Sequence, residues 1–144
     1  MTAAHIERVT DATVVQAAAD LFDSPPLATA TARFLASPDH HLLLARDLEG
    51  TAVGMVTGVE TTHPDKGTEM FVYELGVAPA ARRRGIATAL LRALAELAQE
   101  RGCYGMWVAV DSNNVAALAL YARVGALDDG TCAVLGWSFS TDSA

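Results

Sequence analysis

Several features that define other protein classes are missing from this 144-residue sequence. It has only two cysteines, Cys103 and Cys132, with no CxxC pair, so a disulfide framework is not expected and a reducing cytoplasm fits. No apolar run approaches membrane length, and residues 1–11 lack the hydrophobic core of a signal peptide. We therefore expect a cytoplasmic protein with no membrane partner.

Basic residues are also scarce. Lys and Arg total 10 against 17 Asp and Glu, which gives a net charge of −7. An acidic chain repels nucleic acid and anionic membranes, so a cationic partner is favoured. The nucleotide-binding patterns G-x-x-x-x-G-K-[ST] and G-x-G-x-x-G are absent. The four histidines have no partners at metal-ligand spacing, and we expect no metal.

Apolar residues, at 51%, are ample for one core. A chain of this length buries about two-thirds of its unfolded surface, and we expect a single domain over residues 1–144. A helix between two strands makes those strands a parallel crossover pair, here 69–77 and 103–110. The patterns predict strands at 5–9, 41–48, 51–61, 69–77 and 103–110, helices at 14–22, 27–37, 84–101 and 115–124, and a hairpin over 126–137 around Asp129-Gly130.

Three arginines stand directly before Gly85, between a predicted strand and the longest predicted helix. The first turn of a helix leaves N–H groups unpaired, and the helix dipole adds positive charge there. Gly85 has no Cβ, so a phosphate can approach the backbone. Arginines add bidentate donors. A solvated loop or a nucleic-acid patch is the alternative, but no extended basic face exists. We predict a pyrophosphate site formed by Arg82, Arg83, Arg84, Gly85, Ile86 and Ala87.

This segment resembles the acetyl-CoA signature of the GNAT N-acetyltransferases, Gln/Arg-x-x-Gly-x-Gly/Ala. A second family signature is matched downstream by Asn114-x-x-Ala117-x-x-Leu120-Tyr121-x-x-x-Gly125. The resemblance covers roughly residues 34–125. It implies acetyl-CoA as co-substrate and the GNAT fold, an α/β (α+β) fold with a central mixed, mostly antiparallel sheet of about six to seven strands and about four helices.

The resemblance also implies residue roles. In the family, the tyrosine that matches Tyr121 lies near the cofactor sulfur and protonates the leaving thiolate, whereas in an arbitrary helix it would only pack. Asn114 either contacts the cofactor or merely caps its helix, and both readings stay open. Leu75 and Val77 are expected to offer backbone groups that orient the pantetheine arm and polarise the thioester carbonyl.

Glu74 is the candidate general base. Strand alternation places it with Met70, Val72 and Gly76 on one face. A carboxylate on a mostly apolar strand is costly to bury unless paired, and desolvation would make it a better proton acceptor. Family enzymes need a base, often acting through water. An internal ion pair is the alternative role, and Glu69 is the reserve candidate.

A closer resemblance concerns the acceptor. The run EMFVYELGVAPAARRRGIATALL, with Asp111, is similar to the aminoglycoside 3-N-acetyltransferases, which carry an aspartate where Glu74 stands. The stretch TCAVLGWSF departs from that group because it lacks their further acids. We expect transfer to a primary amine by direct attack in a ternary complex, with Glu74 and Asp111 binding a small cationic amine, an aminoglycoside of the 3-N type. The alternatives are another small amine or a peptide amine, and a non-catalytic acetyl-CoA-binding module. A homodimer is left open.

Overall fold

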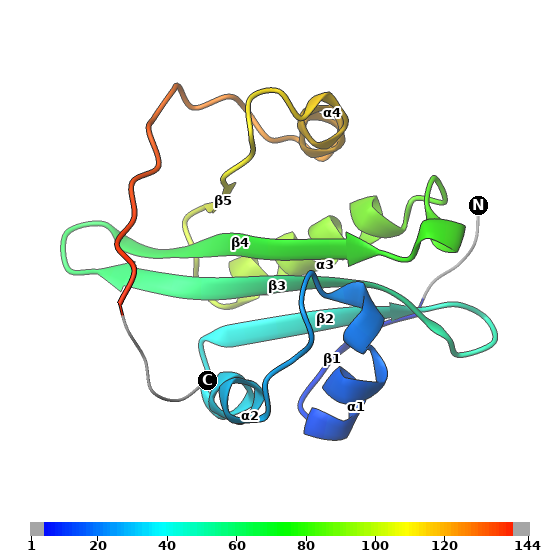
Figure 1. The fold of residues 1–144 in the computed structure, drawn as a ribbon. Helices are drawn as coiled ribbons and strands as arrows, with labels where there is room; N and C mark the ends of the chain where they lie inside the picture. The colour runs from blue at the N-terminus through cyan, green and yellow to red at the C-terminus, as the bar shows by residue number, and fades with distance from the viewer. Residues whose placement is uncertain (1–4, 140–144) are drawn as a thin grey trace.

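The computed structural model describes residues 5–139. Within them, five strands form one sheet in the order β1-β2-β3-β4-β5 (Figure 1). The first four strands pair antiparallel, and β5 pairs parallel with β4, which confirms the predicted crossover. The strands are β1 (His5–Arg8), β2 (His40–Arg46), β3 (Ala52–His63), β4 (Gly67–Val77) and β5 (Met106–Val108).

The helices cover the two faces of this sheet unequally (Figure 1). On one face, α3 (Ile86–Glu100) buries an apolar stripe of five side chains, namely Ile86, Leu90, Leu91, Leu94 and Ala98. Gly54 and Gly58 lie beneath it, and a Cβ on either would press into α3 side chains. On the other face lie α1 (Ala12–Ala17), the 3₁₀ turn η1 (Ala19–Leu21) and α2 (Ala28–Ala36). A second 3₁₀ turn, η2 (Pro79–Ala81), precedes α3, and α4 (Val115–Arg123) follows β5.

The predicted helix over 14–22 is broken at Ala18 into α1 and η1. Asp11 caps α1, because its Oδ1 accepts a hydrogen bond from the Thr13 N–H at 2.9 Å. The break has a packing reason. The Leu21 carbonyl lies so close over Gly76 of β4 that no side chain could occupy that position. The 3₁₀ turn brings the carbonyl there.

The predicted hairpin over 126–137 is wrong for the described residues. No strand follows β5 within residues 5–139, so the sheet has five strands rather than six to seven. The Asp129-Gly130 turn signal produces only a local turn, in which the Gly130 N–H donates to Asp128 Oδ1 at 3.0 Å. A strand needs a hydrogen-bonding neighbour to be stable, and this segment lies against none. The predicted strand 103–110 is shortened to β5, Met106–Val108.

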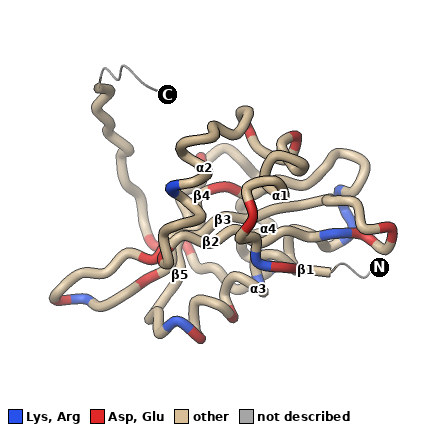
Figure 2. The backbone as a smooth tube through the Cα atoms, turned by 90° about the horizontal axis from the view of Figure 1, so that it is seen from below, with Lys and Arg blue, Asp and Glu red and all other residues tan. Residues whose placement is uncertain are grey.

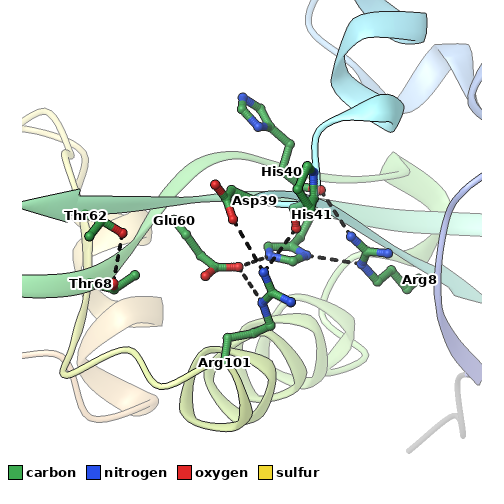
Figure 3. Close-up of polar contacts among 9 residues, drawn as sticks. Arg8, Asp39, His40, His41, Glu60, Thr62, Thr68 and Arg101 are labelled. Carbon is green, nitrogen blue, oxygen red and sulfur yellow. Dashed lines mark hydrogen bonds and ion pairs between the residues drawn. The ribbon is translucent and has the colours of Figure 1, made fainter.

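A buried polar network ties three strands to the carboxyl end of α3 (Figure 3). The His41 side chain is 1% exposed, and its Nε2 lies 2.6 Å from Glu60 Oε2. Arg8 Nε donates to His41 Nδ1 at 3.1 Å, and Arg101 Nε donates to Glu60 at 2.7 Å. Because Nδ1 accepts, Nε2 carries the proton, and the imidazole is a neutral donor to Glu60. Burial lowers the pKa of His41, the positive charge of Arg8 lowers it further, and the hydrogen bond to Glu60 opposes both.

Candidate acetyl-CoA and acceptor sites

The arginine–glycine segment links β4 to α3 through two residues with left-handed backbone. Arg83 has φ 64°, which is unusual for a residue with a side chain, and Gly85 has φ 78°. Arg82 Nε donates to the Val77 carbonyl at 3.3 Å and holds the loop against the end of β4. A Cβ placed on Gly85 would meet no atom within 4 Å. The space in front of Gly85 is therefore open, as a phosphate site requires.

The first turn of α3 supplies donors to that open space. Ala89 N–H is bonded to the Gly85 carbonyl at 3.0 Å, so the helical ladder starts there. The N–H groups of Ile86, Ala87 and Thr88 precede it and have no intrahelical acceptor. All three arginine side chains are exposed around this turn. These residues fit a pyrophosphate, which the backbone N–H donors, the helix dipole and the positive charges of the exposed arginine side chains would hold.

A β-bulge in β4 decides where Glu74 points. Thr57 of β3 pairs with Glu74 and the next residue, Gly58, pairs with Val72, so Tyr73 is an extra residue in β4. The hydroxyl oxygen of Thr57, rather than a backbone carbonyl, accepts a hydrogen bond from the Glu74 N–H at 3.0 Å. An extra residue in one strand reverses the alternation beyond it. Glu74 therefore lies on the opposite face from Val72.

The predicted grouping of Glu74 with Met70 and Val72 is thus wrong, although its grouping with Gly76 holds. Met70 and Val72 belong to the core under α3, and Leu75 and Val77 pack against that same core. Glu74 lies on the face covered by α1, η1 and α2. The bulge divides the strand's carboxyl end, with Leu75 and Val77 toward the predicted cofactor side and the carboxylate toward the other.

On its own face, Glu74 contacts the connection between η1 and α2. Its Oε2 accepts the Asp23 N–H at 2.8 Å. The same connection lines a shallow hollow of about 310 Å³, formed by Ala19, Asp20, Phe22, Asp23, Ser24 and Pro25. Sequence reasoning missed both aspartates, Asp20 and Asp23. Their spacing in DLFDSPP, beside a helix stop, was the available signal.

Tyr121 lies in α4, and Asn114 is the N-cap residue directly before it. Tyr121 is half-buried against the α3 core, and its hydroxyl has no hydrogen-bond partner among residues 5–139. Burial raises the pKa of Tyr121, which keeps the phenol protonated at neutral pH. The Asn114 side chain accepts the Ala117 N–H at 3.1 Å, so its capping role is confirmed. A cofactor contact by Asn114 stays a prediction.

The other two acids named from the sequence are Asp111 and Glu69. Asp111 is exposed in the loop between β5 and α4, where its carbonyl accepts the Asn114 N–H at 2.9 Å. Glu69 accepts the Tyr104 hydroxyl at 2.9 Å. Five residues of strand separate it from Glu74, roughly 16 Å at the usual rise. Glu69 is therefore a poor reserve for a base at the carboxyl end of β4.

Among residues 5–139, no cluster of three or more His, Cys, Asp or Glu side chains is suited to hold a metal ion. None of the helices described in that range is long and apolar enough to cross a membrane.

A model of the Acetyltransferase (GNAT) family matches residues 10–126. The chain belongs to the GNAT acetyltransferase family. It is accordingly an acetyl-CoA-dependent N-acetyltransferase, and its sheet with α3 behind the β4–β5 crossover is the GNAT fold.

Solved structures of other acetyltransferases superpose over nearly the whole chain. An aminoglycoside acetyltransferase, HMB0005, from an uncultured soil metagenomic sample is 26% identical, with a TM-score of 0.79 over 94% of this chain and 99% of that chain. AAC(6')-Iy, solved in complex with a bisubstrate analog, CoA-S-monomethyl-acetylneamine, is 16% identical, with a TM-score of 0.82 over 96% of this chain and 100% of that chain. The ribosomal-protein-alanine N-acetyltransferase from Brucella melitensis biovar Abortus 2308 is 24% identical, with a TM-score of 0.75 over 94% of this chain and 100% of that chain. The last two likenesses concern the fold alone.

Proposed function

We propose that this GNAT enzyme acetylates an amine of an aminoglycoside by direct attack on the thioester in a ternary complex. The bulge at Tyr73 carries the proposal, because it turns Glu74 away from the α3 side and toward the η1–α2 connection. There the Glu74 carboxylate stands beside a hollow lined by Asp20 and Asp23. Ammonium groups bind such carboxylates through charge-assisted hydrogen bonds.

The residues take the following roles. Glu74 accepts the proton that the ammonium group of the acceptor must lose, directly or through one water. The phenol of Tyr121 donates a proton to the thiolate that leaves when the acetyl group is transferred. The first turn of α3 and Arg82, Arg83 and Arg84 hold the pyrophosphate. Acetyl-CoA supplies the activated thioester, and the backbone at Leu75 and Val77 orients it.

The aminoglycoside acceptor is supported by the acids around Glu74 and by the 26% identity to HMB0005. The 3-N position is supported only by the resemblance of the β4 run to enzymes of that type. An amine at a peptide terminus is the second candidate acceptor, and a non-catalytic acetyl-CoA-binding module is the third reading. A thiol-release screen with aminoglycosides, polyamines and peptides separates the three.

The acceptor is tested by its response to salt. Electrostatic steering raises encounter rates by roughly 10–10³ and falls steeply with ionic strength. We expect kcat/KM for an aminoglycoside to fall as salt rises. Asp23→Asn and Asp111→Asn should raise KM for the polycation more than for a simple monoamine, whereas Asp65→Asn, in the β3–β4 turn, should change neither. A monoamine or neutral peptide that outperforms every aminoglycoside at low salt would contradict the assignment.

The catalytic roles are tested by two conservative variants. Glu74→Gln and Tyr121→Phe should each lower kcat by about 10²–10⁴, the usual loss for a missing general base or acid. Acetyl-CoA affinity, measured by calorimetry, should be unchanged in both. A Glu74→Gln enzyme with full kcat across the pH range would show that another group accepts the proton. No thiol release from any amine would favour the binding module.

A further inference from the structure

Three aromatic side chains form one continuous row on the sheet, here called the aromatic row, with Phe71 of β4 in the middle. The ring of Phe71 lies 4.3 Å from that of Trp107 in β5, between centroids, with the planes tilted by 31°. It lies 5.8 Å from the ring of Tyr73, in an edge-to-face contact. Such pairs stabilise a sheet. They leave much of the row in water, however, because Tyr73 is 73% exposed and Trp107 46%.

The aromatic row lies on the same face of the sheet as Glu74. Met70 and Val72, which flank Phe71 in β4, belong to the core under α3, so Phe71 lies on the other face. The bulge places Glu74 on that face too, directly after Tyr73. Helices α1 and α2 pack on β2 and β3 there, as Figure 1 shows. The row on β4 and β5 is therefore an uncovered surface beside the proposed base.

A second carboxylate stands at the other end of the row. Glu69 is two residues before Phe71, and the pairing of β3 with β4 is regular between them, so both side chains lie on one face. Glu69 is half-buried and accepts the Tyr104 hydroxyl at 2.9 Å. A hydroxyl is a neutral donor, so it leaves the charge of the carboxylate in place. Strands β4 and β5 contain no other acid and no Lys, Arg or His.

Flat apolar surface between two carboxylates matches the chemistry of linked amino-sugar rings. Each such ring has a face of C–H groups that can stack on an aromatic ring, and its ammonium groups are attracted to the faces of Trp and Tyr. Carboxylates bind the same ammonium groups through charge-assisted hydrogen bonds. Glu69 and Glu74 are roughly 16 Å apart along the strand. That distance exceeds one sugar ring, so only a ligand of several linked rings can contact both acids.

We propose that the aromatic row and Glu69 extend the acceptor site and hold the rings of a polycationic amino sugar that lie beyond the reacting amine. The inference rests on the proposed function, because it places the reacting amine at Glu74. Trp107 and Tyr73 stack on the distant rings, and Glu69 binds a distant ammonium group. None of these three residues reaches the reacting amine. They therefore determine which acceptor is bound, and their loss raises KM while kcat stays the same.

Calorimetric titration of the full chain, saturated with CoA, with gentamicin tests the row without any turnover. Trp107→Leu should weaken gentamicin binding about 10-fold, because it removes a ring that stacks and attracts cations. Trp107→Phe keeps a ring and should lose less than about 3-fold. Neither variant should change the affinity for 2-deoxystreptamine, an amine of one ring. Leu48→Ala is the control, since Leu48 is 80% exposed but lies in the β2–β3 turn, and it should bind both ligands as the native chain does.

Salt separates the two parts of the proposed extension. Glu69→Gln should weaken gentamicin binding about 5-fold at low salt, and this loss should disappear at high salt, because exposed charges are screened. The loss in Trp107→Leu should persist at high salt, since stacking does not depend on net charge. Glu49→Gln removes an exposed acid from the β2–β3 turn and should leave gentamicin binding unchanged at either salt concentration.

Three results would each overturn the proposal: a native chain that does not bind gentamicin, a Trp107→Leu chain that binds it as tightly as the native chain, or equally tight binding of the neutral sugar maltotriose. Tyr73→Leu repeats the comparison at the extra residue of the bulge, which has no partner in β3, should Trp107→Leu fail to fold. Gentamicin that binds through the row without thiol release would contradict the proposed transfer alone. Thiol release with unchanged affinity in Trp107→Leu would contradict the extension alone.

Discussion

Gly85 and Gly102 mark the two ends of α3 and share an unusual backbone. Gly85 has φ 78° and Gly102 has φ 82°, and an added Cβ at either would meet no atom within 4 Å. This left-handed conformation costs any residue with a side chain about 1–2 kcal/mol. Only Gly85, however, lies at the end of the helix that presents free N–H groups. A comparison of substitutions at the two glycines therefore separates the effect of backbone strain from the effect of blocking the ligand.

We predict that Gly85→Val and Gly102→Val lower the free energy of unfolding by similar amounts, about 1–2 kcal/mol each. Only Gly85→Val should lose acetyl-CoA affinity, because a branched side chain at that position blocks charge-assisted hydrogen bonds worth roughly 1.5–3 kcal/mol each. Calorimetric titration of both folded variants makes the comparison. Equal acetyl-CoA affinities in the two variants would move the pyrophosphate site away from Gly85.

At the scale of elements, β4 and η1 meet without an intervening side chain. The Leu21 carbonyl occupies the position that a Cβ on Gly76 would need. Gly76 is two residues beyond Glu74 in β4. This close approach fixes η1, which contains Asp20, and the connection after it, which contains Asp23. The acceptor side of the site is thus positioned through the packing of one glycine.

Gly76→Ala should push η1 off the sheet. We expect a loss of about 1–3 kcal/mol in the free energy of unfolding, the usual cost of overpacking, together with a raised KM for the amine. Acetyl-CoA affinity should change little, because α3 lies on the other face. Gly105→Ala is the control, since a Cβ there would meet nothing within 4 Å. A destabilised Gly76→Ala enzyme with an unchanged KM for the amine would show that η1 does not position the acceptor site.

Local signals predicted most of the elements. The helix predicted over 84–101 is α3, the pairing of β4 with β5 follows the predicted crossover, and Asn114 caps α4. The face of Glu74 could not be predicted by alternation, because a bulge depends on a cross-strand bond from Thr57, 17 residues away. The carboxyl-terminal hairpin failed for a related reason. Its turn signal is local, whereas its strands need a partner that the described chain does not supply.

At the scale of the whole molecule, charges are spread over the surface rather than gathered on one side (Figure 2). In the polar network at the carboxyl end of α3, the side chains of His41 and Glu60 are buried, whereas Arg8 and Arg101 are exposed (Figure 3). It joins β1, β2, β3 and α3 through Arg8, His41, Glu60 and Arg101. It lies at the other end of α3 from Gly85, so it stabilises the fold rather than the pyrophosphate site.

This network makes stability depend on pH. Burial is the main reason that the native pKa of His41 lies below its ordinary value, and the positive charge of Arg8, whose Nε–H donates to Nδ1, lowers it further. The unfolded chain then binds more protons than the native chain, so the contribution is complete above the unfolded pKa of about 6.5 and is lost as pH falls below it. Burial raises the pKa of Glu60, but the hydrogen bonds from His41 and Arg101 outweigh burial, so the pKa of Glu60 is lowered. The contribution of Glu60 to stability is therefore lost only at more acid pH.

Urea unfolding should show the free energy of unfolding decreasing from pH 7.5 to pH 5.5. His41→Gln should cost about 1–3 kcal/mol at pH 7.5 and flatten that decrease, since a buried partner is lost. His63→Gln, at an exposed position, should keep the native slope, and an equally steep slope in His41→Gln would assign the pH dependence to other groups.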